Sequence, residues 1–258
     1  MERMSSKNII YLTFSIVLED NTLEVENMSK LSERLREYVE ACPENTIVEI
    51  GALYREFFSH DSETAFAKAV ERMVKAGDIV QITRGVYYKP RRTDFGVVPL
   101  TDNAIADHYM RDGHGIAIGY KLYNDKGIST QVGKNVEILS DSLPGEQKRA
   151  GNVKVTKSSV GLTSMTIPVI ETMEILQNYS KIEDLNRKRL AAYMKEFASN
   201  YSEEATHEVI SKRKYKKSTI AFLKAFLDYL NVPNTLGRYL SELSNYKIPR
   251  IEDIYETA

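Results

Sequence analysis

The 258-residue chain contains one cysteine, no tryptophan and almost no excess of either charge. A single cysteine, Cys42, excludes an internal disulfide and any zinc site built from several cysteines. It fits a reducing compartment, and its apolar neighbours Val39 and Ala41 favour a buried thiol with a packing role. The 35 Lys and Arg residues face 36 Asp and Glu residues, which gives a formal net charge of -1. The overall charge therefore gives no support for nucleic-acid binding, and any basic surface must be local.

The sequence also lacks a hydrophobic run long enough to span a membrane. The apolar stretch near the N-terminus, IIYLTFSIVL at residues 9–18, is too short to cross a bilayer as a helix. The EDNTLE sequence behind it lacks the small residues of a signal-peptide cleavage site. We therefore expect a cytoplasmic protein with no membrane partner. Residues 1–28 are predicted to form an N-terminal extension, either packed on the body as a strand or helix or lying upstream of a natural start at Met28.

Common catalytic motifs are missing as well. The four histidines have no metal-ligand spacing, and the sequence contains neither a Walker loop for phosphate nor a GxSxG nucleophile elbow. We expect the protein not to be an enzyme and to have no catalytic, metal or cofactor site. One alternative stays open, a nuclease or transferase built on the middle of the chain. It would depend on acid and histidine residues such as Asp107, Asp112 and His114.

The region from residue 29 to residue 58 reads as two helices. Apolar residues recur at helical spacing through residues 31–39, and Pro43 ends this first predicted helix. Thr46 is followed three residues later by Glu49, the spacing of a capping box, which predicts a second helix starting at Thr46. Phe57 and Phe58 close that segment.

The most informative stretch is SETAFAKAVERMVKAGDIVQITRGVYYKP at residues 62–90. Its first half carries one apolar stripe, which includes Phe66, Val70 and Met73 and predicts an amphipathic helix that Gly77 ends. Two β-prone runs then flank Gly85, which can take the positive φ of a hairpin loop. Helix, helix, helix and hairpin within about sixty residues is the order of a winged helix-turn-helix.

The rest of the chain divides into two further regions. Residues 93–165 mix predicted helices at 101–110 and 118–124 with predicted partner strands at 132–140 and 152–156, and Pro144 and Gly145 mark a turn between the strands. Residues 166–258 are predicted to be helical. The predicted fold class is α+β, with an N-terminal winged helix-turn-helix at 29–92, a small α+β middle domain at 93–165 and a helical C-terminal region at 166–258.

A winged helix places its third helix in the major groove and its hairpin against the flanking backbone. With the apolar stripe buried, the helix turns Ser62, Thr64, Lys68 and Arg72 outward. The hairpin offers Arg84 at its tip and Lys89, Arg91 and Arg92 at its base. Asp61 and Glu63 oppose this reading, because they favour the helix dipole but repel phosphate.

A second basic feature is KRKYKK at residues 212–217. Basic residues around one tyrosine can follow a phosphate backbone. Most runs of this kind are solvated helix ends or loops instead. Both readings stay open for this segment.

Two blocks of the sequence are similar to a known family. AFAKAVERMVKAGDI at residues 65–79, followed by RGVY at 84–87 and by Pro90, resembles the winged-helix segment of the AbiEi antitoxin family, including its DUF6088 branch. GISTQV at residues 127–132 resembles that family's Gly-Leu-Ser-Thr-Gln-Val stretch. The likeness covers about residues 29–160. The chain departs from the family pattern at Met73, at the acidic Asp61 and Glu63, and in its apolar N-terminal run.

The resemblance implies a function that composition and spacing do not give. Family members repress their own toxin–antitoxin operon and counter a nucleotidyltransferase-like toxin, often without a stable complex. On this basis Arg72 and Arg84 are expected to contact DNA, and Gly85 and Tyr87 to shape the wing, with Tyr87 included in the DNA-binding surface. The expected partners are double-stranded DNA at the protein's own operator, as inverted repeats, and the cognate toxin. The alternative is a protein-interaction module that uses the winged helix only as a scaffold.

Overall fold

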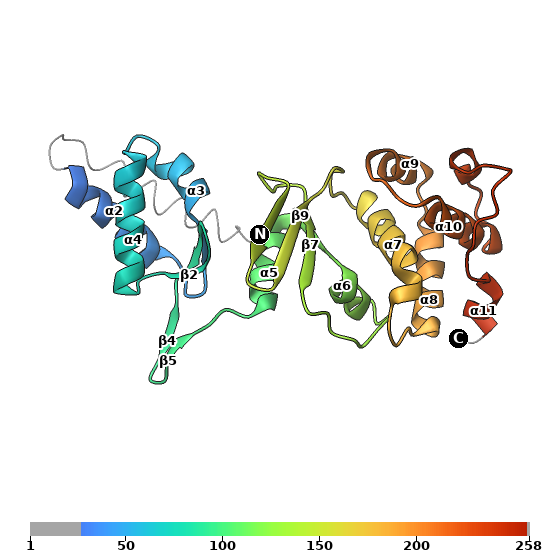
Figure 1. The fold of residues 1–258 in the computed structure, drawn as a ribbon, viewed down its shortest axis with the longest axis horizontal. Coiled ribbons are helices and arrows are strands. Elements are labelled where there is room, and N and C mark those ends of the chain that lie inside the picture. The colour runs from blue at the N-terminus through green and yellow to red at the C-terminus, as the bar shows by residue number, and fades with distance from the viewer. Residues whose placement is uncertain (1–26, 257–258) are drawn as a thin grey trace, which may run out of the picture. The chain divides into compact units, whose positions relative to one another are not determined.

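The computed structural model describes residues 27–256, so the extension predicted for residues 1–28, with its apolar run at 9–18, lies outside it except for Asn27 and Met28. Contacts divide the chain into two units, Met1–Thr101 and Asp102–Ala258 (Figure 1). The first unit contains helices α2 (Asn27–Ala41), α3 (Ile50–Leu53) and α4 (Glu63–Ala76), a π-helical turn (Tyr54–Phe58), and strands β1 (Ile47–Glu49), β2 (Val80–Thr83), β3 (Val86–Tyr88), β4 (Arg91–Thr93) and β5 (Gly96–Val98).

The core of the first unit forms between α2 and α4. The predicted stripe of α2 is buried at Leu31, Leu35 and Val39, and it packs with Phe66 and Val70 of α4. Both helices are amphipathic, and each buries its apolar face against the other and against residues of neighbouring segments such as Val48, Phe58 and Ile79. The first and third predicted helices are therefore confirmed.

The prediction that the second helix starts at Thr46 was wrong. Residues 47–49 form β1, and the helical conformation begins only at Ile50. Ile47 pairs with Tyr88 and Glu49 with Val86 in an antiparallel ladder. The β-branched Ile47 and Val48 gain a sheet partner from a part of the chain about forty residues away, which outweighs the local capping-box signal.

The predicted hairpin is confirmed, and its two strands join β1 in a three-stranded sheet of order β1-β3-β2. Gly85 has a φ of 77° and lies in the loop that connects β2 to β3. Pro90 ends the hairpin as expected. Arg91 and Arg92, which were expected at the base of this hairpin, begin a second, separate hairpin of β4 and β5.

The second unit begins with a four-stranded sheet. Its elements are α5 (Asp102–Met110), β6 (Gly115–Ile118), α6 (Gly119–Asp125), β7 (Val136–Ser140), β8 (Gln147–Ala150) and β9 (Val153–Lys157), with sheet order β6-β7-β9-β8. The helices at 101–110 and 118–124 are confirmed within one residue. Strands β7 and β9 are neighbours as predicted, but they run parallel, because the chain turns back through β8.

The sequence did not indicate β6 or β8. Gly115 begins a buried strand at a position where a Cβ atom would lie 2.1 Å from the Tyr109 carbonyl oxygen. Only glycine allows this close approach of two backbone segments. Strand β8, with the sequence QKRA, has little β-propensity and forms an edge of the sheet.

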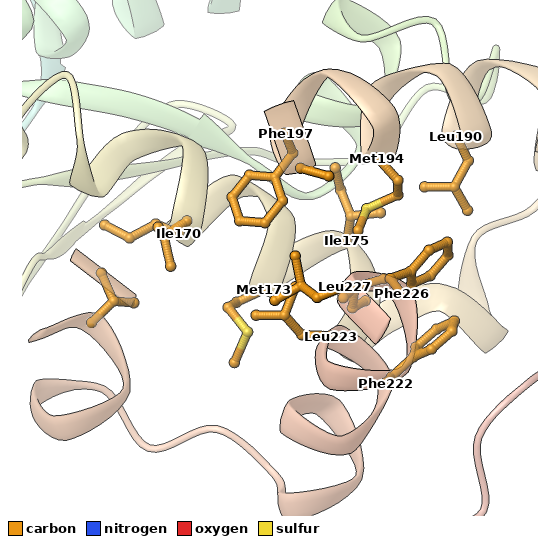
Figure 2. Close-up of a cluster of buried hydrophobic side chains, with 14 of the residues drawn as sticks. Ile170, Met173, Ile175, Leu190, Met194, Phe197, Phe222, Leu223, Phe226 and Leu227 are labelled. Carbon is orange, nitrogen blue, oxygen red and sulfur yellow. The ribbon is translucent and has the colours of Figure 1, made fainter. Parts of the chain in front are cut away.

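Helices fill the rest of the second unit. They are α7 (Thr166–Asn178), α8 (Arg187–Ser199), α9 (Glu203–Lys212), α10 (Lys217–Tyr229) and α11 (Ile251–Glu256), with short 3-10 turns between some of them. Their apolar faces meet in one core, shown in Figure 2, to which Met173, Leu190 and Phe226 contribute. The same core includes Leu122 and Leu139 from the sheet region, so the sheet and the helices of this unit are packed together.

The chain is thus a mixed α+β protein with small sheets, as the sequence predicted. Within residues 27–256, no helix has the length and apolar character needed to cross a membrane.

Candidate nucleic-acid interface

Helix α4 has one buried and one exposed face. Phe66, Ala69, Val70 and Met73 are buried, whereas Ser62, Thr64, Lys68 and Arg72 are all exposed. The Ser62 side chain accepts a hydrogen bond from the Ala65 backbone N–H and so caps the helix. At the other end Gly77, with a φ of 78°, ends it in the left-handed conformation. Thr64, Lys68 and Arg72, spaced four residues apart, therefore share the solvent face of one regular helix, and Ser62, also predicted to face outward, is the exposed cap in front of its first turn.

The acid in front of α4 has a partner that the sequence did not reveal. The Arg34 guanidinium on α2 donates to both carboxylate oxygens of Asp61, at 3.3 and 3.2 Å. Arg34 also lies over the Phe58 ring, 5.1 Å from its centroid. The negative charge of Asp61 is therefore compensated, whereas Glu63 on α4 is exposed. No spacing rule could have linked Arg34 to Asp61, because the pair joins two elements only through the tertiary fold.

Arg84 and Tyr87 occupy different environments in the β2–β3 hairpin. Arg84 is exposed in the loop, and the space beside Gly85 is open. The Gly85 carbonyl accepts a hydrogen bond from the Ile50 backbone N–H at 3.0 Å, which holds the loop against the start of α3. Tyr87 is half-buried and packs against the core of the first unit. Arg84 can reach a ligand, and Tyr87 contributes mainly to the shape of the hairpin.

The three basic residues after the hairpin are not equivalent. Lys89 Nζ donates to the carbonyl oxygens of Glu40 and Cys42, both at 2.7 Å, and so satisfies the C-terminal end of α2. Arg92 donates to the Gly77 carbonyl at 2.6 Å, at the end of α4. Arg91 is exposed on β4. Two of the three cations therefore have a structural partner within the first unit.

Most of the basic run at residues 212–217 is also used within the fold. Arg213 lies 2.9 Å from the buried carboxylate of Glu174. Lys212 pairs with Glu208 on the same helix, and Lys217 donates to the Tyr239 carbonyl. These contacts favour the structural reading of this run over a phosphate-binding one.

The residues named for the enzyme alternative do not gather into a site. Asp107 and Asp112 are exposed, and His114 pairs with Asp141 at 3.0 Å. Among residues 27–256 no group of three or more His, Cys, Asp or Glu side chains could hold a metal ion. His207 takes part in a polar network with Glu203 and Tyr239 that connects α9 to the segment after α10.

A cavity of about 340 Å³ lies within the second unit, lined in part by α6, β7 and α7. Tyr120, Tyr123, Glu137 and Glu174 contribute to its wall, together with Lys134 and Lys181. Burial raises the pKa of Glu174, and the nearby Arg213 opposes this shift. Glu174 is already paired with Arg213, and the other charged residues of the wall, Glu137, Lys134 and Lys181, carry charges of both signs.

The GISTQV stretch has a clear structural role. Gly127 adopts a φ of 68° after α6, and Ile128 is buried. The Ser129 hydroxyl donates to the Glu183 carbonyl at 2.7 Å, and the Asn186 backbone N–H donates to the Ile128 carbonyl at 2.7 Å. The stretch therefore fastens the sheet region to the start of α8.

Comparison with known proteins places the chain in a family. The model of a family of unknown function, DUF6088, matches residues 35–191, which is more than half of the chain. The protein belongs to the DUF6088 family. No curated protein matches it. One solved structure, the RV2827C protein from Mycobacterium tuberculosis, matches with 12% identity over 79% of this chain and 78% of that chain, at a TM-score of 0.44. A likeness at this level transfers neither fold nor function.

Within this DUF6088 protein, the matched residues include α4, the β2–β3 hairpin and the GISTQV stretch. Both sequence blocks on which the resemblance was based therefore lie inside the family region. The match says nothing about what family members bind.

Proposed function

We propose that the first unit binds double-stranded DNA as a winged helix-turn-helix, with α4 as the recognition helix and the β2–β3 loop as the wing. The exposed face of α4 carries this proposal, because Thr64, Lys68 and Arg72 lie on it while the opposite face is buried, and Ser62 is exposed at the cap of the same helix. The order α2-β1-α3-α4-β2-β3 and the β1-β3-β2 sheet agree with such an arrangement.

The contacts divide by position along α4. Ser62, the cap of α4, and Thr64, in its first turn, are short hydrogen-bonding side chains suited to base edges in the major groove. Lys68 and Arg72 lie further along and are long enough to reach phosphates or guanine. Arg84 in the hairpin loop would hold the flanking backbone and fix the register. Lys89 and Arg92 do not contact DNA in this proposal, because their cationic groups already donate hydrogen bonds to backbone carbonyl groups of the first unit.

Local charge decides whether this surface tolerates phosphate. The ion pair with Arg34 compensates Asp61, and Glu71 pairs with Lys75 on α4 at 2.8 Å. Glu63 remains as an uncompensated acid at the front of the helix. Its carboxylate can accept a hydrogen bond from a cytosine amino group, a role in base recognition that acidic side chains serve.

We further propose that the protein is a cytoplasmic antitoxin that represses its own operon and counters a nucleotidyltransferase-like toxin without a stable complex. This step rests on the likeness of the AFAKAVERMVKAGDI, RGVY and GISTQV segments to the AbiEi antitoxin family. Repression at inverted repeats would bring two copies of the chain onto neighbouring half-sites.

The deciding experiment is an electrophoretic shift with the DNA upstream of the protein's own gene, at several salt concentrations. We expect a sequence-specific shift that Arg72→Ala and Arg84→Ala weaken. Loss of one phosphate contact lowers the slope of log affinity against log salt by about one. The matched control is Arg36→Ala, which removes an exposed arginine of α2.

The absence of any specific shift by the wild-type protein at modest salt would contradict DNA binding. A stable protein partner together with no shift would favour the alternative, in which the first unit is a scaffold for protein contact. Antitoxin activity needs a separate test, rescue of growth when the neighbouring toxin gene is expressed.

A further inference from the structure

The β4–β5 hairpin has an open edge with unusual composition. The two strands form a sheet of their own, so the outer edge of β5 has no strand partner among residues 27–256 (Figure 1). The sequence along this edge is FGVVP at residues 95–99, without a charge. Phe95 is 102% exposed and Val97 is 42% exposed. Exposed apolar edge strands are normally covered or protected by charges, because their free peptide groups can pair with another strand.

The strand register shows which peptide groups face outward. Thr93 pairs with Gly96 across the turn, and Arg92 pairs with Val97. Hydrogen-bonded and non-hydrogen-bonded pairs alternate in an antiparallel ladder, and the pair that closes a two-residue turn is hydrogen-bonded. The next pair is then non-hydrogen-bonded, so the N–H and C=O groups of Val97 point away from β4. They lie at the centre of the open edge.

The two edges of the hairpin differ in what they can accept. Strand β4 carries Arg91 and Arg92, and pairing two such edges would bring like charges together. Strand β5 carries only Gly96, Val97 and Val98. An extended, uncharged segment can therefore pair with β5 without burying a charge, and the β5 strand of another copy is such a segment.

We propose that β5 mediates self-association, with the β5 strands of two copies pairing antiparallel about a twofold axis through Val97. Val97 of one copy then faces Val97 of the other and exchanges two backbone hydrogen bonds with it. Phe95 of each copy lies beside Pro99 of the other, an apolar contact. Pro99 has no N–H group and ends the ladder, so the contact stays short.

The size of the contact sets its strength. A few residues on each strand bury far less than the 1,200–2,000 Å², roughly, that stable protein interfaces bury. We therefore expect a weak dimer that forms at high protein concentration and is strengthened when two copies are held close together. The inference goes beyond DNA binding and does not depend on it, since the test below contains no DNA.

Disulfide trapping in the full-length chain tests the pairing directly. Hydrogen-bonded antiparallel pairs have Cα atoms about 5.5 Å apart, within the range that a disulfide spans. Val97→Cys should therefore convert on mild oxidation from the 29.4 kDa chain to a species of twice that mass on a non-reducing gel. The native Cys42 is only 2% exposed, so it adds no background. Val132→Cys, at a position that is 88% exposed, is the control for random collision.

Equal dimer yields from Val97→Cys and Val132→Cys would overturn the proposal. A second measurement is sedimentation equilibrium of the wild type, Val97→Lys and Val97→Thr. Lysine places two like charges at the twofold axis and should abolish the dimer, whereas threonine keeps a β-branched side chain and should retain it. A wild-type protein that stays monomeric at every concentration reached would also overturn the proposal. Circular dichroism checks that each variant is folded.

Discussion

The Arg34 guanidinium lies 3.2 Å from the Asp61 carboxylate, and this ion pair joins the middle of α2 to the residue just before the cap of α4. Arg34 and Asp61 are both largely covered, with 33% and 16% of their side chains exposed. The pair holds α2 against the segment before α4 and compensates one of the two acids, Asp61 and Glu63, that oppose a DNA-binding surface there. It is thus both a packing contact and part of the electrostatics of the candidate interface.

Arg34→Ala is expected to destabilise the protein by about 1–3 kcal/mol, because it leaves a covered carboxylate without its partner. Urea unfolding measures this change. Arg36→Ala is the control, since the Arg36–Asp78 pair is longer, at 3.9 Å, and more exposed. Arg36→Ala should lower the free energy of unfolding by no more than about 1 kcal/mol. Equal losses in the two variants would contradict the role assigned to Arg34.

Gly77→Ala and Gly85→Ala form a matched pair. Both glycines have a positive φ, 78° and 77°, so alanine at either position costs about 1–2 kcal/mol. A Cβ atom at Gly77 would also lie 2.8 Å from the Arg92 guanidinium, whereas the space around Gly85 is open. Gly77→Ala should therefore lower the free energy of unfolding by roughly 0.5–1.5 kcal/mol more than Gly85→Ala does. This difference is the contribution of the Arg92–Gly77 hydrogen bond. Equal unfolding free energies would show that this bond contributes nothing.

Glu174 should give the protein a measurable pH dependence of stability. Burial raises the pKa of Glu174 above its ordinary value, although Arg213 lowers it in part. A carboxyl group with a raised pKa in the folded state contributes stability below its unfolded pKa of about 4.3. That contribution is lost as the pH rises through the folded pKa.

The comparison is urea unfolding of the wild type and Glu174→Gln at several pH values. Relative to the variant, the wild type should lose stability as the pH rises above the unfolded pKa of about 4.3 and through the raised folded pKa of Glu174. Glu208→Gln is the control, because Glu208 forms an exposed pair with Lys212. A wild type that gains stability over this range would mean that the Arg213 pairing outweighs burial.

Cys42 should not react in the folded protein. Burial raises the pKa of the thiol to about 11, while Lys89 lowers it in part. The thiolate is the reactive form, so almost none is present near pH 8. A thiol reagent should modify Cys42 only after denaturation, and a fast reaction of the native protein would contradict its buried placement.

The sequence by itself determined the elements whose signals are local. Helix α4 has its apolar stripe, its Ser62 cap and its glycine stop within one continuous stretch, and the following hairpin has its loop glycine. The outward residues Thr64, Lys68 and Arg72 followed directly from that helical period. These features were predictable because each depends on residues only a few positions apart.

The tertiary structure decided whatever depends on a distant partner. The β1 strand forms because β3 is available to pair with it, against the local capping-box signal. The parallel pairing of β7 and β9 required β8, a polar edge strand. The cations Arg34, Lys89 and Arg213 look alike in the sequence, and only the fold supplies the carboxylate or carbonyl group that each one binds. Sequence spacing sets the face of a helix, but the partner of a charge is set by the three-dimensional approach of elements far apart in the chain.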